Sequence, residues 1–328
     1  MSYIDEIQLL TKRAIEKGDL KEREAERIYE IGLEHPFLVM AEATRIREHF
    51  KGKRITLCMI INAKSGLCPE DCKFCAQSAH HMTGIETYPL LSPEEILKEA
   101  KKAKEAGAHC FGIVTSGRSV DGEEEWGFIL EAVRKISDMG LKVCASLGFL
   151  DRQRAEELKK AGLYRYHHNI ETARSFFGQI CTTHTFDEKI ETIRSAKRAG
   201  LSVCSGGIIG MGEDVGVRVK MALTLRELGV DSVPINILNP RPGTPLEGLV
   251  ALRPMEILLS IALFRFLLPS KDIKLCAGRE LHLRQLIPLA LVAGCSSLMT
   301  GDYLTTKGRD PDLDKEMIED LDLTWNLS

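Results

Sequence analysis

The chain has 328 residues, of which 44% are hydrophobic and 28% are charged, and its formal net charge is −3. This length is typical of a single α/β barrel, and the composition is that of a globular protein with a large buried core. The small negative charge argues against nucleic acid or an anionic membrane surface as the main partner.

The N-terminus is acidic and lacks an apolar segment, so we expect no secretory signal. The apolar run 257–268 contains Arg265 and is too short to cross a membrane. Ten cysteines in a chain without an export signal indicate reduced thiols in a cytoplasmic protein. We therefore expect thiols that are available to bind metal, not a framework of disulfides.

Residues 1–50 are predicted to form two or three amphipathic helices, with Leu9, Leu10, Ala14 and Ile15 on one face and charges on the other. This pattern predicts an N-terminal helical cap, or a surface through which two copies of the chain associate.

From residue 51 to residue 306, apolar runs of strand length alternate with helical patterns. The runs are 55–62, 109–115, 142–146, 164–169, 202–209, 232–238, 273–277 and 297–300. Ser92-Pro93-Glu94-Glu95 has the residues of a helix N-terminus. Successive helices are predicted to end at Gly107, Gly140, Gly162, Gly200 and Gly229, each shortly before a strand.

Eight such strand–helix units predict an α/β fold, a (β/α)8 TIM-type barrel over 51–306 with the N-terminal helical extension over 1–50. The remaining residues, 307–328, are predicted to be a C-terminal tail packed on the barrel. A doubly wound sheet is the alternative, but regular units without a break in composition favour a closed barrel. Catalytic groups of such barrels lie at the C-terminal ends of the strands.

A short loop directly after the first predicted strand carries three cysteines, Cys68, Cys72 and Cys75. The spacing C-x3-C-x2-C lets one loop direct three thiolates at a single metal centre, and thiolates favour zinc or iron–sulfur clusters. Three ligands leave one position of a four-position centre open, as reactive sites require. A zinc loop completed by His80 or His81 is the alternative, but the third cysteine and the preceding Phe74 favour iron–sulfur.

The motif C-x3-C-x-aromatic-C resembles the signature of the radical S-adenosylmethionine (SAM) enzymes. The flanking residues Gly66-Leu67-Cys68-Pro69-Glu70-Asp71-Cys72 and Cys75-Ala76-Gln77-Ser78 are similar to those of one family among them, the biotin synthases. The resemblance runs from about residue 36 to residue 306. It implies a 4Fe-4S cluster on the three loop cysteines, with SAM bound at the open iron.

Four further cysteines lie on four different predicted strands: Cys58, Cys110, Cys144 and Cys204. Because side chains alternate faces along a strand, these four can converge inside the barrel. A single buried cysteine is usually a small hydrophobic residue, but four of them beside cluster chemistry indicate a second metal site. The resemblance implies that Cys110, Cys144 and Cys204 are ligands of the auxiliary cluster that donates sulfur in the family.

The sequence departs from the family at the fourth ligand of that cluster. Lys274 stands where the familiar form has arginine, and Cys58 stands where it has serine. Lysine is a poor iron ligand. We therefore predict that Cys58 takes the place of the arginine as the fourth ligand and that Lys274 does not bind. Four thiolates can hold either a two-iron or a four-iron cluster. A four-iron cluster with an additional sulfide is favoured, and 2Fe-2S is the alternative. Cys276 is the reserve ligand, and Cys181 and Cys295 are predicted to serve packing.

The resemblance also implies the residues that contact cofactor and substrate. Those predicted to contact SAM are Phe74, Gly206, Ile208, Gly210, Glu171 and Asn169. Glu171 would accept a hydrogen bond from the ribose, although the commoner family residue is aspartate, and Asn169 would bridge ribose and substrate. Asn236 would bind the ureido ring of dethiobiotin, and Thr305 and Thr306 would hold its carboxylate.

The function implied is that of a sulfurtransferase that inserts sulfur into dethiobiotin by 5′-deoxyadenosyl radical chemistry, with no side chain acting as acid or base. The resemblance further implies a homodimer and a reducing electron donor such as flavodoxin or ferredoxin, with no nucleic acid or membrane partner. The alternatives are a radical enzyme of the hydrogenase maturase or methylornithine synthase type, or a non-enzymatic iron–sulfur carrier.

Overall fold

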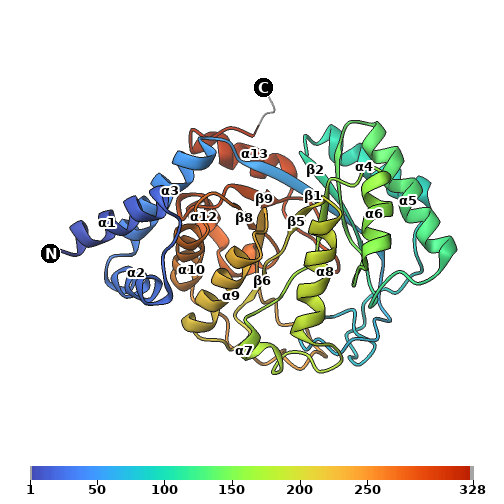
Figure 1. The fold of residues 1–328 in the computed structure, drawn as a ribbon, viewed down its shortest axis with the longest axis horizontal. Coiled ribbons are helices and arrows are strands. Elements are labelled where there is room, and N and C mark those ends of the chain that lie inside the picture. The colour runs from blue at the N-terminus through green and yellow to red at the C-terminus, as the bar shows by residue number, and fades with distance from the viewer. Residues whose placement is uncertain (1, 326–328) are drawn as a thin grey trace.

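A closed ring of parallel strands forms the centre of the computed structural model, which describes residues 2–325 (Figure 1). The strands are β1 (Thr56–Lys64), β2 (Cys110–Thr115), β3 (Lys142–Ser146), β4 (Arg165–His167), β5 (Ser202–Cys204), β6 (Gly207–Ile209), β7 (Ser232–Ile237), β8 (Asp272–Leu275) and β9 (Ser297–Met299). Their order in the sheet is β5-β4-β3-β2-β1-β9-β8-β7-β6, and the pairing of Cys204 with Ser232 joins β5 to β7 and closes the ring. The predicted barrel is confirmed.

One predicted strand, 202–209, is broken into β5 and β6 at Ser205 and Gly206. The break follows from a close approach of two backbones, because a Cβ on Gly206 would lie 2.0 Å from the carbonyl oxygen of Pro234. The other predicted strands are found within a few residues of their expected bounds.

Helices enclose the strands on the outside (Figure 1). They are α4 (Pro93–Glu105), α5 (Glu123–Asp138), α6 (Arg152–Lys160), α7 (Arg174–Phe177), α8 (Phe186–Arg198), α9 (Val215–Glu227), α10 (Pro254–Leu267), α11 (Arg279–His282), the 3-10 helix η1 (Arg284–Leu286), α12 (Ile287–Val292) and α13 (Pro311–Asp320). α4 begins with a capping box, in which Ser92 Oγ accepts from Glu95 N and the Glu95 carboxylate accepts from Ser92 N. The five helix-ending glycines all have positive φ, which explains glycine at those positions.

Three helices precede the barrel: α1 (Tyr3–Glu16), α2 (Glu22–Glu34) and α3 (Pro36–Lys51). They pack on the apolar helix α10, whose middle residues are buried between them and the strands. Leu10 and Ala14 face this contact as predicted, but Leu9 is 56% exposed and Ile7 is buried in its place. The predicted face was therefore wrong at Leu9, because the helix is rotated so that Ile7, Leu10 and Ala14 form the inner stripe.

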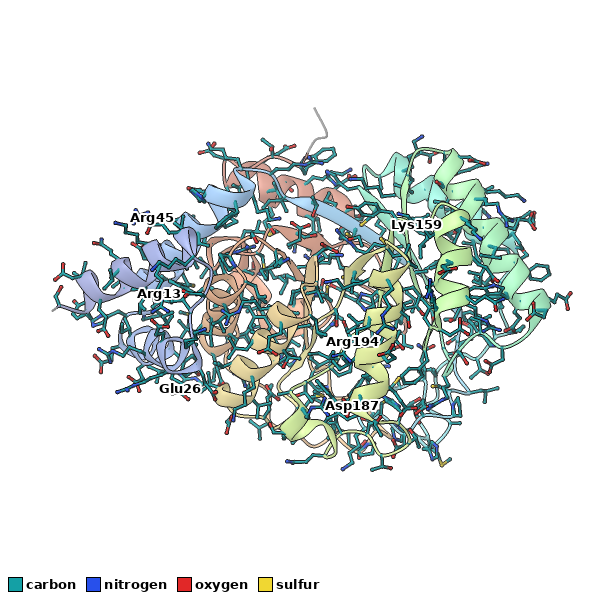
Figure 2. The ribbon with its side chains drawn as sticks, viewed as in Figure 1. Arg13, Glu26, Arg45, Lys159, Asp187 and Arg194 are labelled. Carbon is teal, nitrogen blue, oxygen red and sulfur yellow. The ribbon has the colours of Figure 1, made fainter. Side chains whose placement is uncertain are left out.

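The outer surface is charged, and Figure 2 shows side chains such as Glu26, Arg45 and Arg194 directed away from the barrel. Among residues 2–325 the structure has no helix with the length and apolarity needed to cross a bilayer. Met1 and residues 326–328, which end the predicted tail 307–328, lie outside the described residues.

Candidate functional site

One cavity of about 420 Å³ extends from the loops at the C-terminal ends of the strands into the barrel interior. Its wall includes all seven cysteines of the two predicted groups: Cys58, Cys68, Cys72, Cys75, Cys110, Cys144 and Cys204. Predicted cofactor and substrate residues also line it: Phe74, Asn169, Glu171, Ile208, Asn236, Thr305 and Thr306. Gly206 and Gly210 are not among its lining residues; they shape the backbone next to the cavity.

The loop that carries Cys68, Cys72 and Cys75 is folded back on itself by its own backbone. Cys68 N donates to Gln77 O at 3.0 Å, Ala79 N donates to Cys68 O at 2.7 Å, and Cys75 N donates to Cys72 O at 2.9 Å. The three thiols are partly exposed to the cavity, and none forms a disulfide. Three soft donors on one folded loop, with room for a further ligand, fit an iron–sulfur cluster with an open position.

The histidines considered as zinc ligands are engaged elsewhere. His80 Nε2 lies 2.9 Å from Pro69 O, and His81 Nδ1 lies 3.0 Å from Cys75 O. Both imidazoles hydrogen-bond the loop backbone, so they fix the shape of the loop and do not complete a zinc site with its thiols.

Glu70 anchors the cysteine loop to two other segments of the barrel. Its carboxylate accepts from Arg118 Nη1 at 2.8 Å and contacts Thr183 Oγ1 and His184 Nδ1. Burial would raise the pKa of Glu70, but the hydrogen bonds from Thr183, Arg118 and His184 outweigh it and lower this pKa to about 2. Sequence reasoning assigned Glu70 no role, because its partners are distant in the chain.

Cys181 lies beside the cysteine loop, and it is buried in the apolar core as predicted, although polar groups also contact its thiol. Its Sγ is 3.8 Å from Cys72 Sγ and 3.3 Å from His184 Nδ1. Asp71 fixes this segment, because its carboxylate accepts from Thr182 N at 2.8 Å. Cys181 is buried, but against a thiol and an imidazole, so it belongs to the surroundings of the cluster loop.

Sheet register brings the four strand cysteines together in the barrel interior. Cys58 pairs with Cys110 across β1 and β2, Cys144 lies opposite Gly112 of β2, and Cys204 lies opposite His167 of β4. The interaction with Cys110, together with burial, raises the pKa of the Cys58 thiol well above its usual value. The neighbouring Cys144 raises the pKa of Cys110 to about 12.

Lys274 and Arg165 place two cations among these thiols. Burial would lower the pKa of Lys274, but attraction to the ionised forms of the Cys58 and Cys204 thiols raises it well above its usual value. Burial would also lower the pKa of Arg165, but attraction to the ionised forms of Cys204 and Cys144 raises it above its usual value. Four soft donors with two cations beside them fit an iron–sulfur cluster whose thiolate ligands carry excess negative charge. The reserve ligand Cys276 also lines this part of the cavity.

Asn169 and Glu171 extend from the end of β4 toward β6. Asn169 Oδ1 accepts from Gly206 N at 3.1 Å, and Glu171 O accepts from Ile208 N at 2.9 Å. Glu171 has φ +68°, a backbone conformation that is uncommon for a residue other than glycine. Burial raises the pKa of its carboxyl group. Backbone strain and a perturbed carboxyl inside a cavity are typical of functional positions.

The turn after β6 is closed by Glu213, a residue to which sequence reasoning gave no separate role. Its carboxylate accepts from Gly210 N at 2.8 Å and from Met211 N at 2.7 Å. The buried Arg218 donates to the same carboxylate through Nε at 2.7 Å. Since Gly210 has φ +93°, glycine and this ion pair together fix the backbone of the predicted cofactor segment.

The predicted substrate residues lie around the mouth of the barrel. Asn236 on β7 donates through Nδ2 to Gly207 O at 3.4 Å and accepts from Ala277 N at 3.3 Å. Thr306 O accepts from Tyr303 N at 3.0 Å, which shapes the loop after β9. Arg241 also lines the cavity, and its Nε is buried without a hydrogen-bond partner among residues 2–325. It offers a cation that the sequence did not single out.

Two family profiles match the chain, the radical SAM superfamily over residues 64–225 and the biotin and thiamin synthesis associated domain over residues 234–324. The chain is 49% identical over 319 residues to the biotin synthase of Geotalea uraniireducens (strain Rf4), covering 97% of both chains. It is 53% identical over 283 residues to that of Pelotomaculum thermopropionicum (strain DSM 13744 / JCM 10971 / SI), covering 86% of this chain and 88% of the relative.

Solved structures support the fold. The crystal structure of methylornithine synthase superposes with a TM-score of 0.84 at 21% identity, over 97% of both chains. An FeFe-hydrogenase maturase from Carboxydothermus hydrogenoformans gives a TM-score of 0.79 at 19% identity, over 97% of this chain and 79% of that one. At these identities the likeness concerns the architecture of the barrel.

Proposed function

The chain belongs to the biotin synthase family of radical SAM enzymes, and we propose that it inserts sulfur into dethiobiotin with two separate iron–sulfur centres in one barrel. The observation that carries this proposal is the single cavity lined by two groups of cysteines, three on a loop and four on strands. The enzyme is a sulfurtransferase.

The loop thiolates Cys68, Cys72 and Cys75 would hold a 4Fe-4S cluster, and their number would leave one position without a protein ligand, open to SAM. When bound, the loop cluster would supply the electron for reductive cleavage of SAM, and the auxiliary cluster would supply sulfur for the substrate. The protein itself positions the reactants and excludes water from the barrel interior. No side chain is needed as an acid, a base or a nucleophile.

Residues at the ends of β4 and β6 bind the nucleoside part of SAM. Glu171 accepts a hydrogen bond from the ribose, and Asn169 lies between ribose and substrate. Phe74 and Ile208 supply apolar surface, while Gly206 and Gly210 let the backbone take the required path. This assignment is supported by the strained Glu171 backbone and by the fixed turn after β6.

Dethiobiotin lies between the two centres. The side-chain amide of Asn236 offers both a donor and an acceptor, which suits the ureido ring. Thr305 and Thr306 bind the carboxylate, and we add Arg241 as a cation available to the same group. Its support is a buried guanidinium nitrogen without a partner among residues 2–325.

The auxiliary cluster is bound by four thiolates, Cys58, Cys110, Cys144 and Cys204. A four-iron cluster with an additional sulfide is our favoured form, and 2Fe-2S is the alternative. Lys274 and Arg165 balance the charge of the centre and do not ligate iron. This role is supported by the raised pKa values of both cations, which the neighbouring thiols produce.

The enzyme receives electrons from a donor such as flavodoxin or ferredoxin and works in the cytoplasm, a location that agrees with ten free cysteines. It forms a homodimer through the three N-terminal helices. Support for the dimer comes from apolar side chains that these helices expose, Leu9 at 56%, Leu33 at 64% and Phe37 at 67%. Light scattering of the protein in solution tests the dimer.

The test of function is anaerobic turnover with SAM, a reductant and dethiobiotin. We expect SAM cleavage that depends on dethiobiotin and yields biotin. Release of 5′-deoxyadenosine that is independent of dethiobiotin would favour a methylornithine synthase or hydrogenase maturase type of reaction. Transfer of a cluster to an acceptor protein without SAM cleavage would identify a carrier.

A further inference from the structure

A third group of metal-ligating side chains lies beside the cluster loop. Cys72, Cys181 and His184 bring one ligand atom each to within 4.8 Å of one another. Cys181 and His184 are buried and come from the segment before α8, whereas Cys72 comes from the loop after β1. Neither Cys181 nor His184 has a part in the proposed reaction.

The distances in this group match those of a metal site. An ion at ~2.3 Å from two sulfurs in a tetrahedral arrangement places them about 3.8 Å apart, and a sulfur and an imidazole nitrogen about 3.5 Å apart. The Cys72 and Cys181 Sγ atoms are 3.8 Å apart. Cys181 Sγ is 3.7 Å from His184 Nε2. Two thiolates and one imidazole leave a fourth position for water.

The surroundings of the group also match. Glu70 contacts His184 Nδ1, which would leave Nε2 free to bind an ion. A carboxylate on the far nitrogen of a ligating histidine fixes its tautomer and raises its basicity. Asp71 Oδ1 lies 3.2 Å from Cys181 Sγ and accepts a hydrogen bond from Thr182 N. The segment that carries Cys181 and His184 is therefore fixed.

We propose that Cys72, Cys181 and His184 bind one borderline divalent ion, iron(II) or zinc, in protein that lacks the SAM cluster. The inference rests on the proposed function, in which Cys72 is a cluster ligand. Because Cys72 belongs to both sites, the ion and the cluster exclude one another, and loading of the cluster draws Cys72 away from Cys181. Ion binding releases to solvent any protons that the two thiols still hold.

Cobalt(II) titration of cluster-free protein under anaerobic conditions tests the site, since thiolate-to-cobalt charge transfer reports sulfur ligation. We expect Cys181→Ser and His184→Gln to bind one ion fewer than the unaltered protein. Cys68→Ser and Cys75→Ser, which remove cluster ligands only, bind as many ions as the unaltered protein. Cys295→Ser is the matched control for loss of a buried thiol and also keeps the ion. Glu70→Gln lowers the affinity about 10–100-fold.

An unchanged number of ions in Cys181→Ser, or an equal loss in Cys68→Ser, overturns the proposal. After cluster reconstitution, Cys181→Ser holds as much iron as the unaltered protein, whereas Cys68→Ser holds less. If Cys68→Ser loses no iron while Cys181→Ser still loses the cobalt, the proposed cluster assignment fails and the mononuclear site stands.

Discussion

The two groups of cysteines are held in place by different physical means. On the loop, the backbone folds back between Cys68 and Ala79, and Glu70 ties it to Arg118 and to the segment before α8. On the strands, the register of the sheet alone sets the positions, as in the pairing of Cys58 with Cys110. The loop thiols are partly exposed, whereas Cys58, Cys110 and Cys204 are buried.

This difference indicates what each site tolerates. A loop held by side-chain contacts can change its ligands without a change in the barrel. A site built on hydrogen-bonded strands is rigid, because a one-residue shift of any of these strands would turn its cysteine out of the interior.

The largest effect is expected from removal of a loop ligand. Cys75→Ala should lower SAM cleavage by at least about 1000-fold, since the cluster loses a ligand and no other residue supplies the reductive chemistry. Iron bound by the strand cysteines should remain. Product analysis by mass spectrometry and iron determination measure the two effects, and Cys295→Ala serves as the control. Retention of full SAM cleavage would refute the assignment of the loop.

Removal of a strand ligand should separate the two halves of the reaction. Cys58→Ser should lower biotin formation about 100-fold or more, while SAM cleavage stays within a few-fold of its original rate. The reason is that the loop and its contacts are unaltered, whereas the auxiliary cluster loses a thiolate. Quantification of biotin and 5′-deoxyadenosine in the same reaction tests this separation. Equal loss of both products would mean that the two centres do not act independently.

A smaller effect, on stability, is expected at the anchor of the loop. Glu70→Gln should destabilise the protein by about 2–3 kcal/mol at pH 7, because one of the two oxygens that face Arg118 and His184 becomes an amide donor and the negative charge is lost. The pKa of Glu70 is lowered from 4.5 to about 2 in the folded protein. Its contribution is therefore complete above about pH 4.5 and is lost as the pH falls toward 2. Urea unfolding of both proteins at pH 7 and pH 3 should give a smaller difference at pH 3.

Sequence reasoning succeeded where a local rule governs. Alternation along the strands predicted that Cys58, Cys110, Cys144 and Cys204 face one interior, and glycine after each helix predicted where helices end. It did not find Cys181 or His184, because their closeness to Cys72 joins segments 109 residues apart. No periodicity encodes such a contact between two loops. The break at Gly206 depends likewise on the approach of Pro234 from another strand.

The smallest effect is expected at Arg241, the cation that we propose binds the substrate carboxylate. Arg241→Met should raise the apparent KM for dethiobiotin about 10-fold, which corresponds to about 1.4 kcal/mol of lost carboxylate binding. The methyl ester of dethiobiotin, which lacks the negative charge, should be used equally by both proteins. An equal loss for acid and ester would assign Arg241 to the structure of its loop.

Iron and sulfide analysis with Mössbauer spectroscopy tests most directly whether one barrel contains two centres. Anaerobically reconstituted protein should contain two clusters, and replacement of Cys58, Cys110, Cys144 and Cys204 by alanine should leave one cluster that still changes its spectrum when SAM is added. The same iron content and spectrum in both proteins would contradict the account, because the strand thiols would then bind no metal.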